Sequence, residues 1–352
     1  MQPDSSAVLE NLPNPLILVS GDRHVTYANQ AALTLFNTIS LGSDLALTLR
    51  HPQVLRAVER ALTDGQALND EFTLSGSVSR VFDFHVAPVF SDTPGAEAHG
   101  VLLTLHEKTA LVRAEQMRAD FVANASHELR SPLSAILGFI ETLQGPAKND
   151  PVARDRFLGI MNREAGRMNR LIDDLLSLSR VELDEHVPPR GRVDLIHTLS
   201  SVIDLLSDRA RTKEIRITLQ KAKDIPVITG DADQLFQVFR NLIENAINYS
   251  PVGSMVDIGL ESGSTLRDSG KSGVTVRISD HGNGIASQHL PRLTERFYRV
   301  DPARGKTGGD GPVSTGLGLA IVKHITNRHR GRLVIESEVG KGSTFSVVLP
   351  QT

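Results

Sequence analysis

Hydrophobic and polar residues alternate over short runs in the first hundred positions, a pattern that predicts strands separated by brief helices. In the run 80–88, Phe82, Phe84 and Val86 fall on one face, as expected for a strand with a single buried side. The expected strands are Leu16–Ser20 and His24–Ala28 around a Gly21-Asp22 turn, Glu71–Ser75, Arg80–Pro88 and Gly100–Leu105, and the expected helices are Asn29–Asn37 and Pro52–Thr63. Residues 1–106 therefore predict a five-stranded antiparallel sheet with helices in its middle, a small α+β sensory or interaction module.

From about residue 107 to 186 the hydrophobic period changes to that of long helices. Gly145-Pro146 ends the first helix, and Asp150-Pro151 begins the second as N-cap and first-turn proline. The apolar stripe of the first helix is Phe121, Ala125, Leu129, Pro132, Ile136, Ile140 and Leu143, and that of the second is Phe157, Met161, Met168, Leu171, Leu175 and Leu178. Two antiparallel helices cannot bury both stripes alone, so we expect two chains to pair into a four-helix bundle.

The third region, residues 190–352, follows a linker at 187–191 that contains Pro188 and Pro189. Its pattern predicts helix, strand, helix, a long glycine-rich stretch, a further helix and two closing strands, Arg332–Ser337 and Ser343–Leu349. We expect helices packed over a mixed sheet. The chain is thus predicted to be multidomain.

Composition narrows the classes of protein that need to be considered. The 352 residues are 40% hydrophobic and 22% charged, as in soluble globular proteins, and the absence of cysteine excludes disulfides, cysteine-bound zinc and a cysteine nucleophile. The longest aliphatic run is Leu16–Val19, far below the roughly 20 residues of a membrane helix. No signal-peptide pattern is visible, so we expect a cytoplasmic protein.

Charge divides unevenly along the chain. Residues 1–106 carry 5 Lys/Arg against 11 Asp/Glu, whereas residues 190–352 carry 22 against 17, within a net charge of −3. The acidic first region argues against DNA binding there, and the basic third region suits a polyanionic ligand, although such an excess can also be a solvated surface.

The first candidate site is Ser126-His127-Glu128-Leu129-Arg130-Ser131-Pro132. On a helical wheel with Phe121 at zero, the apolar stripe centres near about 50° and His127 lies near about 240°. A lone histidine on such a face is usually a solvated surface residue. Because its neighbour Glu128 can hydrogen-bond one ring nitrogen, fix the tautomer and raise the basicity of the other nitrogen, His127 becomes a candidate nucleophile.

The second candidate site is a helix face rich in asparagine. Asn241, Glu244, Asn245 and Asn248 fall within about 100° of one another, with apolar residues on the opposite arc. Amide and carboxylate oxygens are ligands that Mg²⁺ prefers, whereas an ordinary solvent face would be richer in Lys and Glu. We interpret this face as a magnesium site.

Two glycine-rich turns form the third candidate. Asp280-His281-Gly282-Asn283-Gly284 follows a predicted strand, and Thr315-Gly316-Leu317-Gly318 opens a predicted helix. Backbone amides at such turns bind phosphates, although either turn alone could be purely structural. Neither matches the usual dinucleotide or Walker A pattern. The segment between them, from Glu295-Arg-Phe-Tyr-Arg299 through Arg304 and Lys306, is long enough for a mobile lid.

These segments, in this order and spacing, resemble the H, N, first glycine, aromatic and second glycine boxes of sensor histidine kinases over residues 110–352. The resemblance implies an α+β PAS domain at 1–106, a helical-hairpin dimerisation domain at 107–186 and an α/β-sandwich GHKL-type ATP-binding domain at 190–352. The C-terminal motifs are most similar to the phosphate-regulon sensor branch.

The resemblance also implies roles for individual residues. His127 would accept the γ-phosphoryl group of ATP with Glu128 as base, Asn245 with Asn241 would hold Mg²⁺, and Asp280 would bind the adenine amino group. Further nucleotide contacts would come from Asn248, Gly282, Gly284, Arg299, Arg304, Lys306, Thr315, Gly316 and Gly318. Three departures stand out: Asn248 replaces a frequent Lys, Ser131 replaces the Thr or Asn linked to phosphatase activity, and the usual membrane anchor of phosphate-regulon sensors is not seen.

The implied partners are a second copy of the chain and a response regulator whose aspartate receives the phosphoryl group, with direct nucleic-acid binding not expected. The PAS region could take a haem through His24, His51, His85 or His99, carry these as ordinary core or surface residues, or dock a phosphate-transporter accessory protein. The rival functions are a GHKL-type ATPase doing conformational work, which has no need of His127, and an inactive scaffold.

Overall fold

The computed structural model describes residues 5–76, 79–90, 98–222, 224–265, 272–300 and 315–351. Arg304 and Lys306, expected to contact nucleotide, lie outside this range. The chain forms two compact units, Met1–Asp120 and Phe121–Thr352.

The first unit is a five-stranded antiparallel sheet in the order β2-β1-β5-β4-β3, as the alternating pattern predicted. Phe82 and Phe84 lie on its buried face, and they pack with Phe72 at the centre of the core. Its elements are α1 (Ser5–Glu10), β1 (Leu16–Ser20), β2 (Val25–Ala28), α2 (Gln30–Leu35), α3 (Leu45–Thr48), α4 (Pro52–Asp64), β3 (Leu68–Leu74), β4 (Arg80–Phe90) and β5 (Ala98–Glu107).

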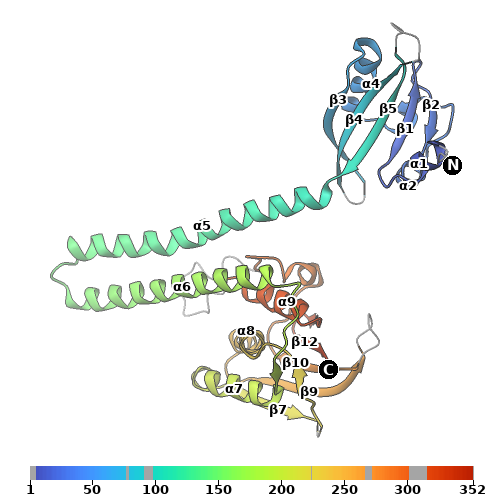
Figure 1. The fold of residues 1–352 in the computed structure, drawn as a ribbon. Helices are drawn as coiled ribbons and strands as arrows, with labels where there is room; N and C mark the ends of the chain where they lie inside the picture. Colours follow the sequence, from blue (N-terminus) through green and yellow to red (C-terminus); the bar gives the residue numbers. More distant parts are fainter. Residues whose placement is uncertain are drawn as a thin grey trace. The chain divides into compact units, whose positions relative to one another are not determined.

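Two long helices, α5 (Thr109–Gln144) and α6 (Pro151–Leu183), form an antiparallel hairpin (Figure 1). The α5 helix continues through Pro132. Asp150 caps α6, and its side chain accepts hydrogen bonds of 3.0 Å from the amides of Val152 and Ala153. Phe139 and Phe157 stack between the helices with ring centroids 5.1 Å apart. All positions of the two expected apolar stripes are buried or half-buried within the single chain.

The C-terminal part of the second unit is a mixed five-stranded sheet in the order β11-β12-β10-β9-β7, with only the β7–β9 pair parallel. The helices α7, α8 and α9 cover one face of this sheet (Figure 1). The elements are β6 (Arg192–Val193), α7 (Leu195–Thr212), β7 (Arg216–Lys221), β8 (Ile228–Thr229), α8 (Ala232–Tyr249), β9 (Met255–Thr265), β10 (Ser272–Asp280), a 3-10 turn (Ser287–Arg292), α9 (Gly318–Arg328), β11 (Arg332–Glu338) and β12 (Gly342–Pro350).

One apolar core holds these helices against the sheet. Phe239 on α8, Ile278 on β10 and Ile321 on α9 are fully buried in it. Leu178 on α6 belongs to the same core, so the C-terminal half of the hairpin packs onto this domain. In the described part of the chain, no helix combines the length and hydropathy that crossing a membrane requires.

Candidate functional site

His127 lies on the exposed face of α5, as the helical wheel predicted. Its neighbour Glu128 is half-buried and points to the other helix of the hairpin, where its Oε2 accepts a 2.8 Å hydrogen bond from Nη2 of Arg167. Within the described residues, no protein group hydrogen-bonds the His127 ring. Glu128 was expected beside the imidazole; the structure places it on Arg167, whose importance no sequence pattern signalled.

Ser131 is exposed one helical turn beyond His127. On a straight helix the two residues point in directions about 40° apart, so both side chains face the same solvent region. The surface around them can therefore present an imidazole and a hydroxyl together to a docked protein.

The α8 helix presents the asparagine-rich face between its buried apolar residues. Asn241 donates a 3.3 Å hydrogen bond to the carbonyl of Gly318, the first residue of α9. Arg209 of α7 pairs with Glu244 and donates a 2.9 Å hydrogen bond to Oδ1 of Asn248. The half-buried Asn245 makes no hydrogen bond with the described residues, which leaves its amide available to a ligand.

Asp280 ends β10 in a position shielded from solvent, only 7% exposed. Its Oδ1 accepts hydrogen bonds from the amides of Gly282 (2.9 Å) and Ser343 (3.2 Å). Burial raises the pKa of the Asp280 carboxyl, against the opposing effect of these amides. The buried carboxyl is thus fixed in orientation through one of its two oxygens.

The first glycine turn has little room for side chains. A Cβ at Gly282 would lie 2.6 Å from the carbonyl oxygen of Tyr249. Gly284 has φ +66, and a Cβ there would lie 1.9 Å from the carbonyl oxygen of Glu338. Both glycines are therefore required by the fold itself, independently of any ligand.

The second glycine turn packs backbone against backbone with the aromatic segment. The amide of Phe297 donates a 2.9 Å hydrogen bond to the carbonyl of Gly316. Gly316 has φ +72, and a Cβ there would lie 2.8 Å from the carbonyl carbon of Phe297. Phe297 also has a positive φ of 64, which an aromatic residue adopts only at a cost in free energy. The second glycine turn and the aromatic segment thus stabilise each other's backbone conformation.

Gly318 behaves differently from the other site glycines. A Cβ at this position would be 3.6 Å from Nδ2 of Asn241, an ordinary van der Waals distance, so packing within the protein does not demand glycine. A ligand that approaches this backbone closely would explain it, and a helix N-terminus suits a phosphate. Asn241 and Asn245 lie on the neighbouring helix with oxygen donors appropriate to Mg²⁺, so the residues present fit Mg-ATP.

One of the remaining expected nucleotide contacts is Arg299. Arg299 is half-buried and follows the aromatic segment. Within the described residues, no cluster of three or more His, Cys, Asp or Glu side chains has a geometry that would hold a metal ion.

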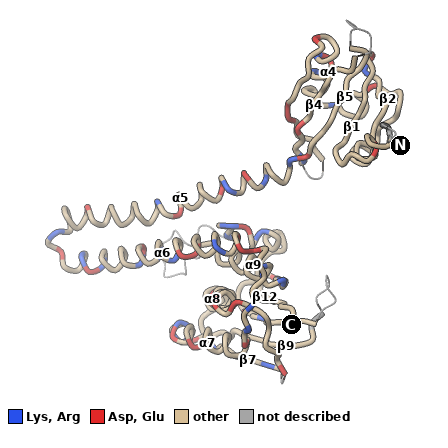
Figure 2. Tube along the Cα trace, viewed as in Figure 1, with Lys and Arg blue, Asp and Glu red and all other residues tan. Residues whose placement is uncertain are grey.

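Thr315 begins the second glycine turn, and its Oγ1 donates a 2.8 Å hydrogen bond to Oδ2 of Asp174 on α6. Burial raises the pKa of the Asp174 carboxyl. Nearby, Arg296 donates a 2.5 Å hydrogen bond to Glu182, and Nδ1 of His324 lies 2.9 Å from Glu185. Charged residues gather where α6 meets α9 (Figure 2). No sequence pattern indicated these contacts, because nothing in the hydrophobic pattern distinguishes Asp174 from its neighbour Asp173.

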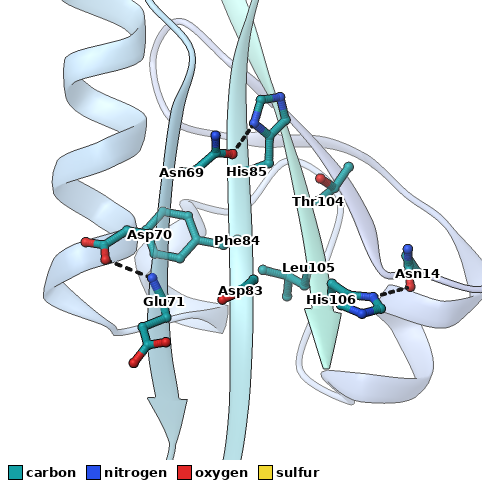
Figure 3. Close-up of a pocket in the computed structure, with 10 residues that line it drawn as sticks. All are labelled: Asn14, Asn69, Asp70, Glu71, Asp83, Phe84, His85, Thr104, Leu105 and His106. Atoms are coloured by element: carbon teal, nitrogen blue, oxygen red, sulfur yellow. Dashed lines mark hydrogen bonds between the residues drawn. The ribbon is translucent and has the colours of Figure 1, made fainter. Parts of the chain in front are cut away.

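The first unit contains a separate hollow of about 480 Å³ on the side of the sheet opposite its core (Figure 3). Nδ1 of His85 lies 2.6 Å from Oδ1 of Asn69, and Lys108 forms ion pairs with Asp83 and Glu71. The lining residues are Asn14, Asn69, Asp70, Glu71, Asp83, Phe84, His85, Thr104, Leu105 and His106. Of the four histidines considered as haem ligands, only His85 lines this hollow; His51 packs against Phe72 instead.

Three family models match the chain. A histidine kinase-, DNA gyrase B-, and HSP90-like ATPase model covers residues 230–352, a His kinase A (phospho-acceptor) model covers 117–184, and a PAS model covers 5–70. These matches confirm the three predicted classes of domain.

Proteins similar to this chain in sequence include named sensor kinases. The chain is 39% identical over 246 residues to the phosphate regulon sensor protein PhoR of Pseudomonas aeruginosa, covering 70% of this chain and 53% of that protein. It is 32% identical over 301 residues to the sensor protein kinase WalK of Staphylococcus aureus, covering 83% of this chain and 68% of that protein. The chain thus spans about half the length of the Pseudomonas relative.

Among solved structures, the histidine kinase ThkA, crystallised in complex with the response regulator protein TrrA, covers 98% of both chains with a TM-score of 0.53 and 21% identity. At this identity the similarity concerns the fold, which agrees with the domains described above.

Proposed function

The chain belongs to the sensor histidine kinase family, and from this premise we propose that it transfers the γ-phosphoryl group of ATP to its own His127. The observation that carries the proposal is the exposed imidazole of His127 on a helical hairpin that continues into an ATPase-type domain. An ATPase that works only by conformational change would have no use for this histidine.

In the proposed step, one ring nitrogen of His127 forms a bond to the γ-phosphorus while the bond from that phosphorus to the β–γ bridging oxygen breaks and ADP leaves. The proton on the other ring nitrogen passes to Glu128, which must turn from Arg167 toward the imidazole. Phosphoryl transfer depends mainly on position and charge neutralisation, so the protein needs to align the two reactants and exclude competing water.

The nucleotide would be held by the ATP-binding domain. Asp280 would accept a hydrogen bond from the adenine amino group with the carboxyl oxygen that its backbone partners leave available. The amides at Gly316 and Gly318 would contact phosphates, and Arg299, Arg304 and Lys306 would add positive charge. Asn245, with Asn241, would hold Mg²⁺, which when bound neutralises phosphate charge.

We propose that the working form is a homodimer. Large apolar side chains remain exposed along the hairpin of the single chain, as Leu137 (52% exposed) on α5 and Leu176 (52%) on α6 illustrate. A second hairpin packed against them would complete a four-helix bundle and bury this surface.

The proposed partner for the phosphoryl group is the aspartate of a response regulator, docked where His127 and Ser131 face solvent together. We further propose that the same surface supports dephosphorylation of that regulator, with Ser131 positioning water. The name of the Pseudomonas relative supports phosphate supply as the signal, with the PAS domain docking an accessory protein.

Incubation with γ-³²P-labelled ATP tests the kinase proposal directly. We expect an acid-labile, alkali-stable label on the protein and no label from α-³²P-labelled ATP. Release of labelled phosphate without labelled protein would instead indicate a GHKL-type ATPase. The absence of both labelled protein and ATP hydrolysis would indicate an inactive scaffold.

A further inference from the structure

Thr315 uses its hydroxyl hydrogen on a side chain of the phosphotransfer hairpin, although it belongs to the turn that should receive ATP. We propose that the Asp174 carboxylate is an internal competitor of the nucleotide: it holds the Thr315 hydroxyl and so sets the ATP affinity of the second glycine turn.

Thr315 cannot donate its hydroxyl hydrogen to Asp174 and to a phosphate oxygen at the same time. A hydroxyl has one hydrogen to donate, and Oγ1 of Thr315 donates it to Oδ2 of Asp174 at 2.8 Å. The same oxygen accepts a 3.3 Å hydrogen bond from the amide of Leu317, inside the turn. A phosphate oxygen can therefore take the Thr315 hydrogen only after Asp174 has released it.

The surroundings of Asp174 strengthen the competition. Its carboxylate is half-buried and interacts electrostatically with Arg240, Glu244 and Asp173. Because burial removes part of its hydration, the charged form gains more from a donated hydrogen bond than an exposed carboxylate would. A negative charge next to this turn also opposes an incoming phosphate.

Several further contacts support the same arrangement of the second unit. Ser177 and Gln237 hydrogen-bond at 2.8–3.0 Å, Arg296 reaches Glu182, and His324 reaches Glu185. Leu178 is fully buried in the core that α6 shares with the ATP-binding domain. The Thr315–Asp174 bond is thus part of an extended interface, so nucleotide and the hairpin contact oppose each other reciprocally.

This inference rests on the proposed function, since it assumes that the second glycine turn binds ATP. The test measures, by calorimetric titration, how tightly the chain of residues 1–352 binds the non-hydrolysable analogue AMPPNP with Mg²⁺. The unmodified chain is compared with the variants Asp174→Ala and Asp173→Ala. Asp173 is the exposed neighbour on the same helix and serves as the matched control. We expect Asp174→Ala to bind at least about fivefold more tightly and Asp173→Ala to bind like the unmodified chain.

The same comparison is repeated in a chain that carries Thr315→Val, because valine keeps the shape of the side chain and removes the hydroxyl. In this Thr315→Val chain, the increase in AMPPNP affinity caused by Asp174→Ala should shrink to less than about twofold. An unchanged gain would overturn competition for the hydroxyl, as would equal affinities of Asp174→Ala and the unmodified chain. Asp174→Asn, which also removes the charge, replaces Asp174→Ala if that variant fails to fold, with a smaller gain expected. If no variant and not even the unmodified chain binds AMPPNP, the proposed function itself falls.

Discussion

Arg167 of α6 donates a 2.8 Å hydrogen bond to Glu128 of α5, directly beside the exposed His127. The residue proposed as base is thus tied to the opposite helix of the hairpin. This hydrogen bond leaves two explanations for the role of Glu128: Glu128 acts on the imidazole of His127, or Glu128 only joins the two helices.

Variants at the two positions distinguish these explanations. If Glu128 acts on the imidazole, Glu128→Ala should slow autophosphorylation by roughly 10²–10⁴-fold, the usual contribution of a general base. Arg167→Gln removes the ion pair and leaves the carboxylate, so it should retain most of the rate. Single-turnover labelling measures both, with the exposed Glu141→Ala as control. Equal losses in Glu128→Ala and Arg167→Gln would mean that only the ion pair matters.

Asn245 offers a test of the magnesium proposal. Its side chain lies on the polar arc of α8 without a protein partner among the described residues, so Asn245→Ala creates no apolar cavity. We expect Mg-ATP affinity to fall at least roughly tenfold, the scale of losing one interaction with a charged group, while the melting temperature stays close to that of the unmodified chain. Titration with Mg-ATP checks this, beside Asn162→Ala on the exposed side of α6. Unchanged affinity would rule out the metal role.

Ser131 should separate phosphatase from kinase activity. A serine hydroxyl can donate and accept hydrogen bonds, as water positioning requires. Ser131→Ala is therefore expected to keep autophosphorylation and to lose dephosphorylation of the phosphorylated regulator, whereas the exposed Ser179→Ala on α6 keeps both. The water-positioning role is wrong if dephosphorylation persists in Ser131→Ala or if both activities fall together.

His329 predicts how stability depends on pH. The residue is only 3% exposed; its Nε2 accepts a 2.9 Å hydrogen bond from the Asp231 amide, and its Nδ1 donates to the Ile325 carbonyl at 2.8 Å. Burial lowers the pKa of His329 below its ordinary value of 6.5, so the ring stays neutral to a lower pH in the folded chain than in the unfolded chain. The unfolded chain therefore takes up this proton first as the pH falls, and the stability present above about pH 6.5 is lost below it.

Urea unfolding at pH 7.5 and at pH 5.5, followed by circular dichroism, measures this effect. The pH-dependent part of the free energy of unfolding should shrink in His329→Gln and stay unchanged in His197→Gln, whose side chain is exposed. An identical pH dependence in His329→Gln and the unmodified chain would exclude the buried ring as its source.

Local signals made much of this fold predictable. The Asp150 cap, the buried face of Phe82 and Phe84, and the outward direction of His127 follow from helix and strand periodicity alone. The strand β9 was not predicted, because Gly259 and Gly263 interrupt its alternation, and its place in the sheet depends on pairing with distant β7 and β10.

Contacts between residues of different helices or turns could not be predicted from the hydrophobic pattern. Which residue of α6 faces Glu128 depends on the register of two helices, and Asp174 meets Thr315 through packing between residues 141 positions apart. The same applies to Phe297 and Gly316, whose backbones touch through a close approach that only the folded chain reveals.

The most direct measurement is acid-labile labelling of His127→Gln from γ-³²P-labelled ATP, beside AMPPNP binding by the same variant. His127 is exposed on the hairpin and belongs to none of the expected nucleotide contacts, so its loss should leave binding intact. The account predicts no acid-labile label in His127→Gln and an AMPPNP affinity close to that of the unmodified chain. Full labelling of His127→Gln would contradict it.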